Sequence, residues 1–213
     1  MEQLNTIQKE TETSNLLFAN HFRQVRYNPK IIMKLILSIV ISILMVIVST
    51  FATDFSKIYK ETGISSSQSE QMERIGKIIS MIGGSISAIV MMGVIFTVFL
   101  LISKIMNTST SVKSIFSATL SYILITSIVG LIVNLIQLCF GLSINDYSLT
   151  SLNIFDKGNP WLGAIDLQTI FSVYVFGVML YATNNFSKKA TLIWSIVYLV
   201  IMICFSFIET SFS

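Results

Sequence analysis

Five long stretches without a charged residue constrain this chain more than any other feature. Each is about as long as, or longer than, the roughly 20 residues that an α-helix needs to cross the hydrocarbon core of a bilayer. Their apolar residues do not alternate with polar ones, as the strands of a membrane barrel require, whereas a helix satisfies its own backbone groups in lipid. We therefore predict an all-α integral membrane bundle of five transmembrane helices. The stretches cover 35–53, 78–103, 114–145, 167–187 and 190–208.

The composition agrees with this fold class. Of the 213 residues, 53% are hydrophobic and only 12% are charged, against about 25% charged in soluble domains. We divide the chain into a cytoplasmic N-terminal tail (1–30), a five-helix membrane domain (31–208) and a short outer C-terminal tail (209–213). Asn28 followed by Pro29 is typical of a helix start, so we expect the first transmembrane helix to begin there.

Basic residues are distributed unequally between the two sides of the predicted bundle. The N-terminal tail and the second and fourth loops carry nine of them, and the other side carries five. Lys and Arg in short loops resist translocation. This count predicts a multi-pass protein with its N-terminus in the cytoplasm and its C-terminus outside. The nine residues are Lys9, Arg23, Arg26, Lys30, Lys34, Lys104, Lys113, Lys188 and Lys189.

The N-terminal tail ends in an amphipathic segment. Phe18, Phe22 and Val25 follow helical spacing, with basic residues beside them. The segment either lies on the cytoplasmic leaflet, where basic side chains attract anionic lipid, or docks under the bundle. A tryptophan in the outer segment 153–166 is expected at headgroup level. The predicted lipid-surface residues are Arg23, Arg26, Lys30 and Trp161.

Residues that most enzymes and pumps need are scarce. One histidine rules out the His-Glu-x-x-His zinc motif, and no glycine-rich nucleotide-binding motif occurs. The five stretches contain no acidic or basic residue, whereas ion-coupled pumps place such groups inside the membrane. We predict no enzyme activity, no catalytic, cofactor-binding or metal-binding residues and no nucleic-acid partner. Whether Cys139 and Cys204 form a disulfide is left open.

Two groups of residues inside the stretches are candidates for specific contacts. Asn134 and Gln137 lie three residues apart in the third stretch. They either line a polar passage for a small neutral solute or form hydrogen bonds between helices. Small residues at four-residue spacing in the second stretch let another helix approach closely, either from this chain or from a partner. These candidate interface residues are Ser80, Gly83, Gly84, Ser87 and Ala88.

A loose pattern runs through most of the chain. In its order and spacing, over roughly residues 20–208, it resembles the Yip-domain family of five-helix membrane proteins, in its bacterial branch. Thr126 departs from the pattern, because many relatives have a proline there. The pattern consists of Asn28-Pro29, Ser117-Ala118 through Tyr122 to Gly130, Ala164-Ile165-Asp166-Leu167 with Ile170-Phe171 and Gly177, and Ser187-Lys188-Lys189-Ala190. The family-matched positions are Pro29, Tyr122, Asp166, Gly177, Lys188 and Lys189.

The resemblance implies a small protein of the bacterial cytoplasmic membrane, similar to accessory partners of ABC-type exporters concerned with antimicrobial peptides. With the scarcity of catalytic groups, this predicts a non-enzymatic protein that binds and modulates a larger membrane complex. The alternative is a conduit for a small neutral solute, lined by Asn134 and Gln137. No cofactor is expected. The expected partners are the lipid bilayer and another membrane protein, such as ABC transporter subunits, or a second copy of the chain.

Overall fold

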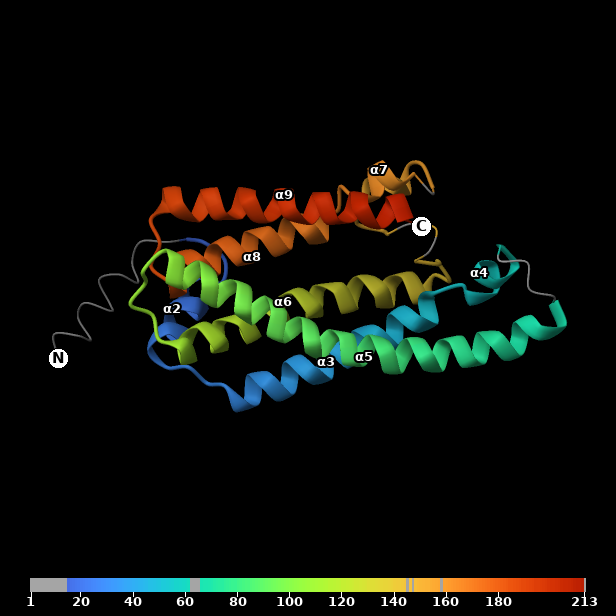
Figure 1. Ribbon diagram of the computed structural model, residues 1–213, viewed down its shortest axis with the longest axis horizontal. Coiled ribbons are helices and arrows are strands. Elements are labelled where there is room, and N and C mark those ends of the chain that lie inside the picture. The colour runs from blue at the N-terminus through green and yellow to red at the C-terminus, as the bar shows by residue number, and fades with distance from the viewer. Residues whose placement is uncertain (1–14, 62–65, 145, 147, 158, 213) are drawn as a thin grey trace.

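The computed structural model describes residues 15–61, 66–144, 146, 148–157 and 159–212, which form a bundle of helices (Figure 1). The predicted all-α class is confirmed for these residues. In chain order the elements are α2 (Ala19–Tyr27), α3 (Ile32–Ala52), α4 (Phe55–Glu61), α5 (Ser66–Ile105), α6 (Val112–Cys139), the 3-10 helix η1 (Leu152–Ile154), α7 (Pro160–Gly163), α8 (Leu167–Thr183) and α9 (Lys188–Phe212).

Four of these helices, α3, α5, α6 and α9, are long and apolar enough to cross a membrane. The predicted fourth span corresponds to α8, which is apolar but has only 17 residues. It ends at Thr183 because the chain turns at Asn184, and Asn185 adopts a left-handed conformation (φ 58°). The fifth span therefore stays a prediction.

The division into tails and membrane domain also stays a prediction. Residues 1–14 of the tail lie outside the described residues, and α9 continues to Phe212, through most of the segment assigned to the outer tail. Cys139 and Cys204 are both free thiols.

The predicted helix start at Pro29 is wrong. The backbone N–H of Asn28 still bonds to the carbonyl of Gln24, so Asn28 ends α2 rather than beginning the next helix. The following helix, α3, begins at Ile32. Pro29 lies in the connection between the two helices, where its missing N–H leaves no helical hydrogen bond unmade.

Helix α6 lies at the centre of the bundle. It packs against α2, α3, α5 and α8, and its contact with α3 is the most extensive between any two of the described helices. Helix α5 lies against both α3 and α6, whereas α9 packs along α8 (Figure 1). The bundle therefore consists of two groups, α3/α5/α6 and α8/α9, which are joined by the contact of α6 with α8 and by α2.

Small and hydroxyl-bearing residues build the contact between α3 and α6. The hydroxyl of Ser38 donates to the carbonyl of Leu120 at 3.1 Å. Large apolar residues of α3, such as Ile32 and Ile36, are instead exposed on the outside of the bundle. This arrangement suits lipid, which gives no hydrophobic drive between helices, so that close packing and hydrogen bonds must hold them together. The buried polar residues of the two helices are Lys34, Ser38, Ser42, Thr50, Ser114, Ser117, Thr119, Ser121 and Gln137.

Helix α2 packs under the bundle, against α6 and α8. Phe22 is 0% exposed and belongs to the apolar core. Thr183 at the end of α8 donates its hydroxyl to the carbonyl of Phe22 at 3.1 Å, and Ser114 of α6 donates to the carbonyl of Arg26 at 2.7 Å. Of the two placements that the sequence left open, α2 takes the docked one.

Replacing Phe22 by Ala is expected to lower the free energy of unfolding by about 3 kcal/mol, because it deletes a buried aromatic ring and leaves a cavity beneath α6 and α8. Denaturant unfolding of the purified protein in detergent would measure this. Gln24→Ala, at an exposed position of the same helix, is the control and should change the value by less than about 0.5 kcal/mol. Equal effects of the two substitutions would contradict a docked α2.

Candidate functional site: a cleft between α5 and α9

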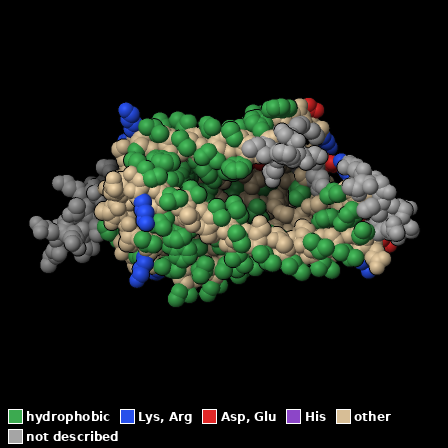
Figure 2. Space-filling view, in the orientation of Figure 1, with side chains coloured by type: hydrophobic (Ala, Val, Ile, Leu, Met, Phe, Trp, Pro, Cys, Tyr) green, Lys and Arg blue, Asp and Glu red, His purple; other side chains and the backbone are tan. Residues whose placement is uncertain are grey.

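A cleft separates the two helix groups. Helix α9 packs on α8 and touches α7, but the described helices include no comparable packing of α9 on α5. The surface is hollowed between them (Figure 2), and the cavity has a volume of about 530 Å³. Its lining comes from α3, α5, α6, α8 and α9, so every long helix contributes. Its lining includes Ser42, Met45, Val46, Ser49, Thr50, Ser80, Gly84, Ala88, Met91, Met92, Tyr122, Thr126, Ser172, Tyr198 and Met202.

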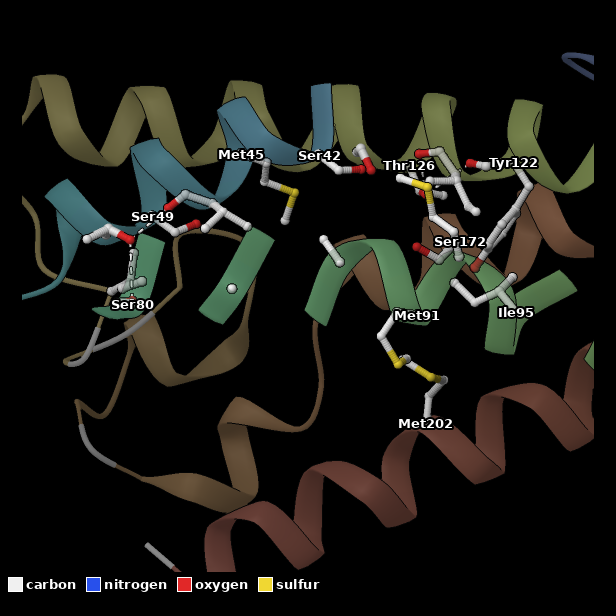
Figure 3. A pocket seen from close by; sticks show the side chains of 18 of the residues that line it. Ser42, Met45, Ser49, Ser80, Met91, Ile95, Tyr122, Thr126, Ser172 and Met202 are labelled. Atoms are coloured by element: carbon white, nitrogen blue, oxygen red, sulfur yellow. Dashed lines mark hydrogen bonds between the residues drawn. The ribbon is translucent and has the colours of Figure 1, made fainter. Parts of the chain in front are cut away.

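Four methionines give the cleft an adaptable wall. Met91 of α5 and Met202 of α9 point toward each other, across from Met45 of α3 (Figure 3). Met92 of α5 also lines the cavity. Methionine side chains are flexible and polarisable and adapt to irregular partners. The cleft can therefore accept an apolar occupant without a fixed shape.

A hydrogen bond between the hydroxyl groups of Tyr122 and Tyr198 lies at one end of the cleft. Their hydroxyl oxygens lie 2.8 Å apart and link α6 to α9. Phe99 packs edge-on against Tyr122, and the ring of Phe176 lies tilted against that of Tyr198 at 4.7 Å between ring centroids. Nearby, Thr126 donates its hydroxyl to the carbonyl of Tyr122 at 2.9 Å. Thr126, which stands where many relatives have a proline, therefore adds a side-chain hydrogen bond within α6.

The predicted small-residue face of α5 divides into two. Ser80, Gly84 and Ala88 line the cleft, and a Cβ atom on Gly84 would lie 2.8 Å from Cγ1 of Val46 in α3. Gly83 and Ser87 are exposed on the outside, and a Cβ atom on Gly83 would meet nothing within 4 Å. Gly84 therefore packs against α3 within the chain, Ser80 and Ala88 face the cleft, and Gly83 and Ser87 face outward.

Asn134 and Gln137 do not line the cavity. The side-chain amide of Asn134 donates to the hydroxyl of Ser49 at 2.7 Å, which links α6 to α3. Gln137 is only 1% exposed. Asn134 therefore forms a hydrogen bond between helices, which is one of the two roles that the sequence left open for it.

The family-matched residues occupy several parts of the bundle. Asp166 caps α8 by accepting a hydrogen bond from the backbone N–H of Gln168 at 2.7 Å. Gly177 lets α8 and α9 approach, because a Cβ atom there would lie 2.6 Å from Oγ of Ser195. The other matched residues are Tyr122 at the cleft, Pro29 between α2 and α3, and the exposed Lys188 and Lys189 at the start of α9.

The predicted lipid-surface residues lie at both ends of the bundle. Arg26 donates to the carbonyl of Thr183 and to the hydroxyl of Ser109, each at 3.3 Å, so its guanidinium neutralises the negative end of α8. At the opposite end, the ring of exposed Trp161 lies tilted against that of Phe207 of α9, with 4.8 Å between the ring centroids. Arg23 and Lys30 lie on and just after α2.

Lys34 is a buried cation that the sequence analysis counted only among the flanking basic residues. Its side chain is 9% exposed, and Nζ donates to Oγ of Ser121 at 2.6 Å and to Oγ of Ser117 at 3.2 Å. The spacing of these two serines, four residues apart in the third stretch, was the available signal. Only the packing of α3 on α6 brings them to Lys34.

His21 of α2 shares this hydroxyl cluster. Its Nε2 lies 3.0 Å from Oγ of Ser121, which also binds Lys34. Loss of hydration at the interface, and then the nearby positive charge of Lys34, lower the pKa of His21 below its ordinary value of 6.5. The docked α2 therefore favours the neutral imidazole.

The outer surface of the bundle defines the class of this protein, and its similarity to known proteins defines the family. The apolar outer faces of four long helices define an integral membrane protein. The family model described as Yip1 domain matches residues 16–208. A Bacillus subtilis (strain 168) protein described as "Membrane protein YknW" is 31% identical over 165 residues, which cover 74% of this chain and 71% of the relative. No solved structure matches the chain. The chain therefore belongs to the Yip1 domain family, as the resemblance predicted.

Among the described residues, no three His, Cys, Asp or Glu side chains lie close enough together to hold a metal ion. The lining of the cleft offers apolar surface and hydroxyl groups, which suit binding.

Replacing Gly84 by Ala is expected to destabilise the bundle by about 1–3 kcal/mol, because the new methyl group overlaps Val46 and forces α3 and α5 apart. Gly83→Ala is the matched control and should be neutral or slightly stabilising, since alanine has the higher helix propensity. Thermal unfolding in detergent compares the two. The double variant Gly84→Ala/Val46→Ala should recover part of the loss, and a failure to do so would place the strain elsewhere.

Acidification is expected to destabilise the wild type through His21. Its pKa is lower in the folded protein than in the unfolded chain, so the unfolded chain binds more protons as the pH falls below about 6.5. The stability that neutral His21 contributes to the folded protein is fully present above that pH and is lost below it. When the pH is lowered from about 7.5 to about 5.5, the melting temperature of the wild type should therefore fall further than that of His21→Gln. Glutamine retains hydrogen-bonding capacity but does not titrate. If the melting temperatures of the two proteins depended on pH in the same way, the docked position of α2 would not affect the protonation of His21.

Proposed function

We propose that this chain is a non-enzymatic membrane protein that binds and modulates another membrane protein, and that the cleft between α5 and α9 receives part of a transmembrane helix of that partner. The main support for this proposal is the cleft itself. Packed interiors leave few voids larger than a water molecule, so an open cleft of about 530 Å³ has room for part of another helix.

The residues that line the cleft favour a helix as its occupant. Met91 lines the cleft and is 50% exposed, so the cleft is accessible from the membrane. The small residues Ser80 and Ala88 leave room for side chains of an entering helix. Methionines on both walls, in α5 and α9, can repack around it.

The proposed topology has five spans, with α8 as the fourth, the N-terminus in the cytoplasm and the C-terminus outside. The 17 residues of α8 equal the lower limit of about 17 residues for a transmembrane helix. Basic residues gather at the end of the bundle where α2 lies, and this "basic end" supports a cytoplasmic location (Figure 2). Its described members are Arg23, Arg26, Lys30, Lys34, Lys104, Lys113, Lys188 and Lys189.

The proposed partner class is an ABC-type exporter in the bacterial cytoplasmic membrane, involved in tolerance of antimicrobial peptides. The support for this finer statement is the resemblance of the chain to the bacterial branch of the Yip-domain family. The conduit alternative has less support, because Asn134 and Gln137 lie away from the cavity.

Photocrosslinking in native membranes tests the proposal. A benzophenone amino acid at Met91 should capture a transporter subunit, identified by mass spectrometry. The control position is Ile86, which lies on the same helix, is 59% exposed and does not line the cleft. Capture from Met91 alone supports a partner helix in the cleft. Lipid adducts or self-adducts alone from Met91 would overturn it.

Two neighbouring substitutions provide a matched test of the cleft in the same experiment. Ala88→Phe fills the cleft, whereas Ser87→Phe adds the same ring on the outward face of α5. The crosslink from Met91 and the tolerance of cells to an antimicrobial peptide should both be lost with the first and kept with the second. Loss of tolerance with both variants, at unchanged protein level, would argue against the cleft.

A further inference from the structure

A second cavity, of about 730 Å³, runs between α8 and α9 and shares no lining residue with the cleft. Its volume lies within the roughly 300–1,000 Å³ range of ligand pockets. Ile170, Val173 and Val178 on α8, with Leu192 on α9, give the groove an apolar lining. We call this cavity the α8/α9 groove.

The α8/α9 groove has a charged end and an apolar interior. Lys188, the first residue of α9, lines one end and is exposed. Ser195 lines the groove about 10 Å further along the helix, at 1.5 Å per residue. Close to Ser195, Gly177 brings the two helices together, because a Cβ atom there would lie 2.6 Å from the serine oxygen. The groove therefore matches a ligand with a charged head and an apolar tail.

A hydroxyl group without a hydrogen-bond partner among the described residues lies between the charged end and the apolar interior of the groove. Thr191 lines the groove one helical turn beyond Lys188. Its Oγ1 is inaccessible to solvent and has no hydrogen-bond partner among the described residues. Buried polar side chains usually have a partner. The ester carbonyl of a lipid, just below its headgroup, supplies an acceptor at this depth once the threonine side chain rotates.

The surrounding charge selects an anionic head. Lys188 belongs to the basic end, whose described charged side chains are all positive. A basic pocket between membrane helices on the cytoplasmic side attracts anionic headgroups. Charge, the unpartnered hydroxyl and the apolar lining thus succeed one another along the groove in the order in which a glycerophospholipid presents phosphate, ester and acyl chain.

We propose that the α8/α9 groove binds a glycerophospholipid with an anionic headgroup. Its phosphate lies at Lys188, an ester group lies at Thr191, and an acyl chain runs past Gly177 along the apolar residues of α8 and α9. Because no residue is shared with the cleft, this inference does not depend on the proposed partner, and either can fail without the other.

Native mass spectrometry of the full chain, released from mild detergent, tests the proposal. The probes are phosphatidylglycerol and phosphatidylethanolamine, added at equal concentration. The wild type should retain phosphatidylglycerol preferentially. Lys188→Gln should reduce this preference about fivefold, the equivalent of roughly 1 kcal/mol for one basic residue near an anionic surface. Lys189→Gln, an adjacent exposed lysine that does not line the groove, is the matched control and should retain it.

A groove-filling variant separates a lipid from a free anion. Val173→Trp should abolish retention of both lipids, because its side chain occupies the acyl region. The two lysine substitutions are on the surface, so they keep the proposal falsifiable if the tryptophan variant does not fold. Equal effects of Lys188→Gln and Lys189→Gln, or no preference in the wild type, would overturn it. Inorganic phosphate that displaces the lipid and still binds a folded Val173→Trp would indicate a phosphate site instead, which also overturns it.

Discussion

The hydrogen-bonded contact between α3 and α6 is the interaction on which the rest of the bundle depends. Ser38 bonds to the carbonyl of Leu120, Asn134 bonds to Ser49, and the ammonium of Lys34 bonds to two serines of α6. In lipid, apolar side chains gain little by leaving their surroundings, so hydroxyls and close packing specify which helices pair. Helices α5, α8 and α2 then pack on the pair that results.

The same physics explains why α9 leaves a cleft. Its described contacts with the centre of the bundle gather at the hydroxyl pair of Tyr122 and Tyr198 and the rings of Phe99 and Phe176. Beyond them, the apolar faces of α5 and α9 can stay apart, because lipid solvates them without the penalty that water would impose. An opening that would collapse in a soluble protein is therefore compatible with a stable membrane bundle.

Helices α8 and α9 connect the cleft, the α8/α9 groove and the basic end. The cleft lies on the side toward α5, whereas the groove begins at Lys188, at the basic end. Helix α2 closes that end through Phe22 and Arg26, whose contacts reach the last residue of α8. A bound lipid and a bound partner helix, as proposed, would thus meet the same two helices through different residues.

The sequence by itself determined roughly where the long helices lie, because length and hydropathy are local properties: each of the five uncharged stretches overlaps one of the helices α3, α5, α6, α8 and α9. It also determined the family. Only the tertiary structure decided which polar and small residues meet. Spacing could not distinguish Gly84, which packs against Val46, from its neighbour Gly83, which faces outward. Spacing also could not predict that Asn134 bonds to Ser49 or that Lys34 is buried among serines. Such contacts join residues more than 80 positions apart and exist only once α3 and α6 have paired.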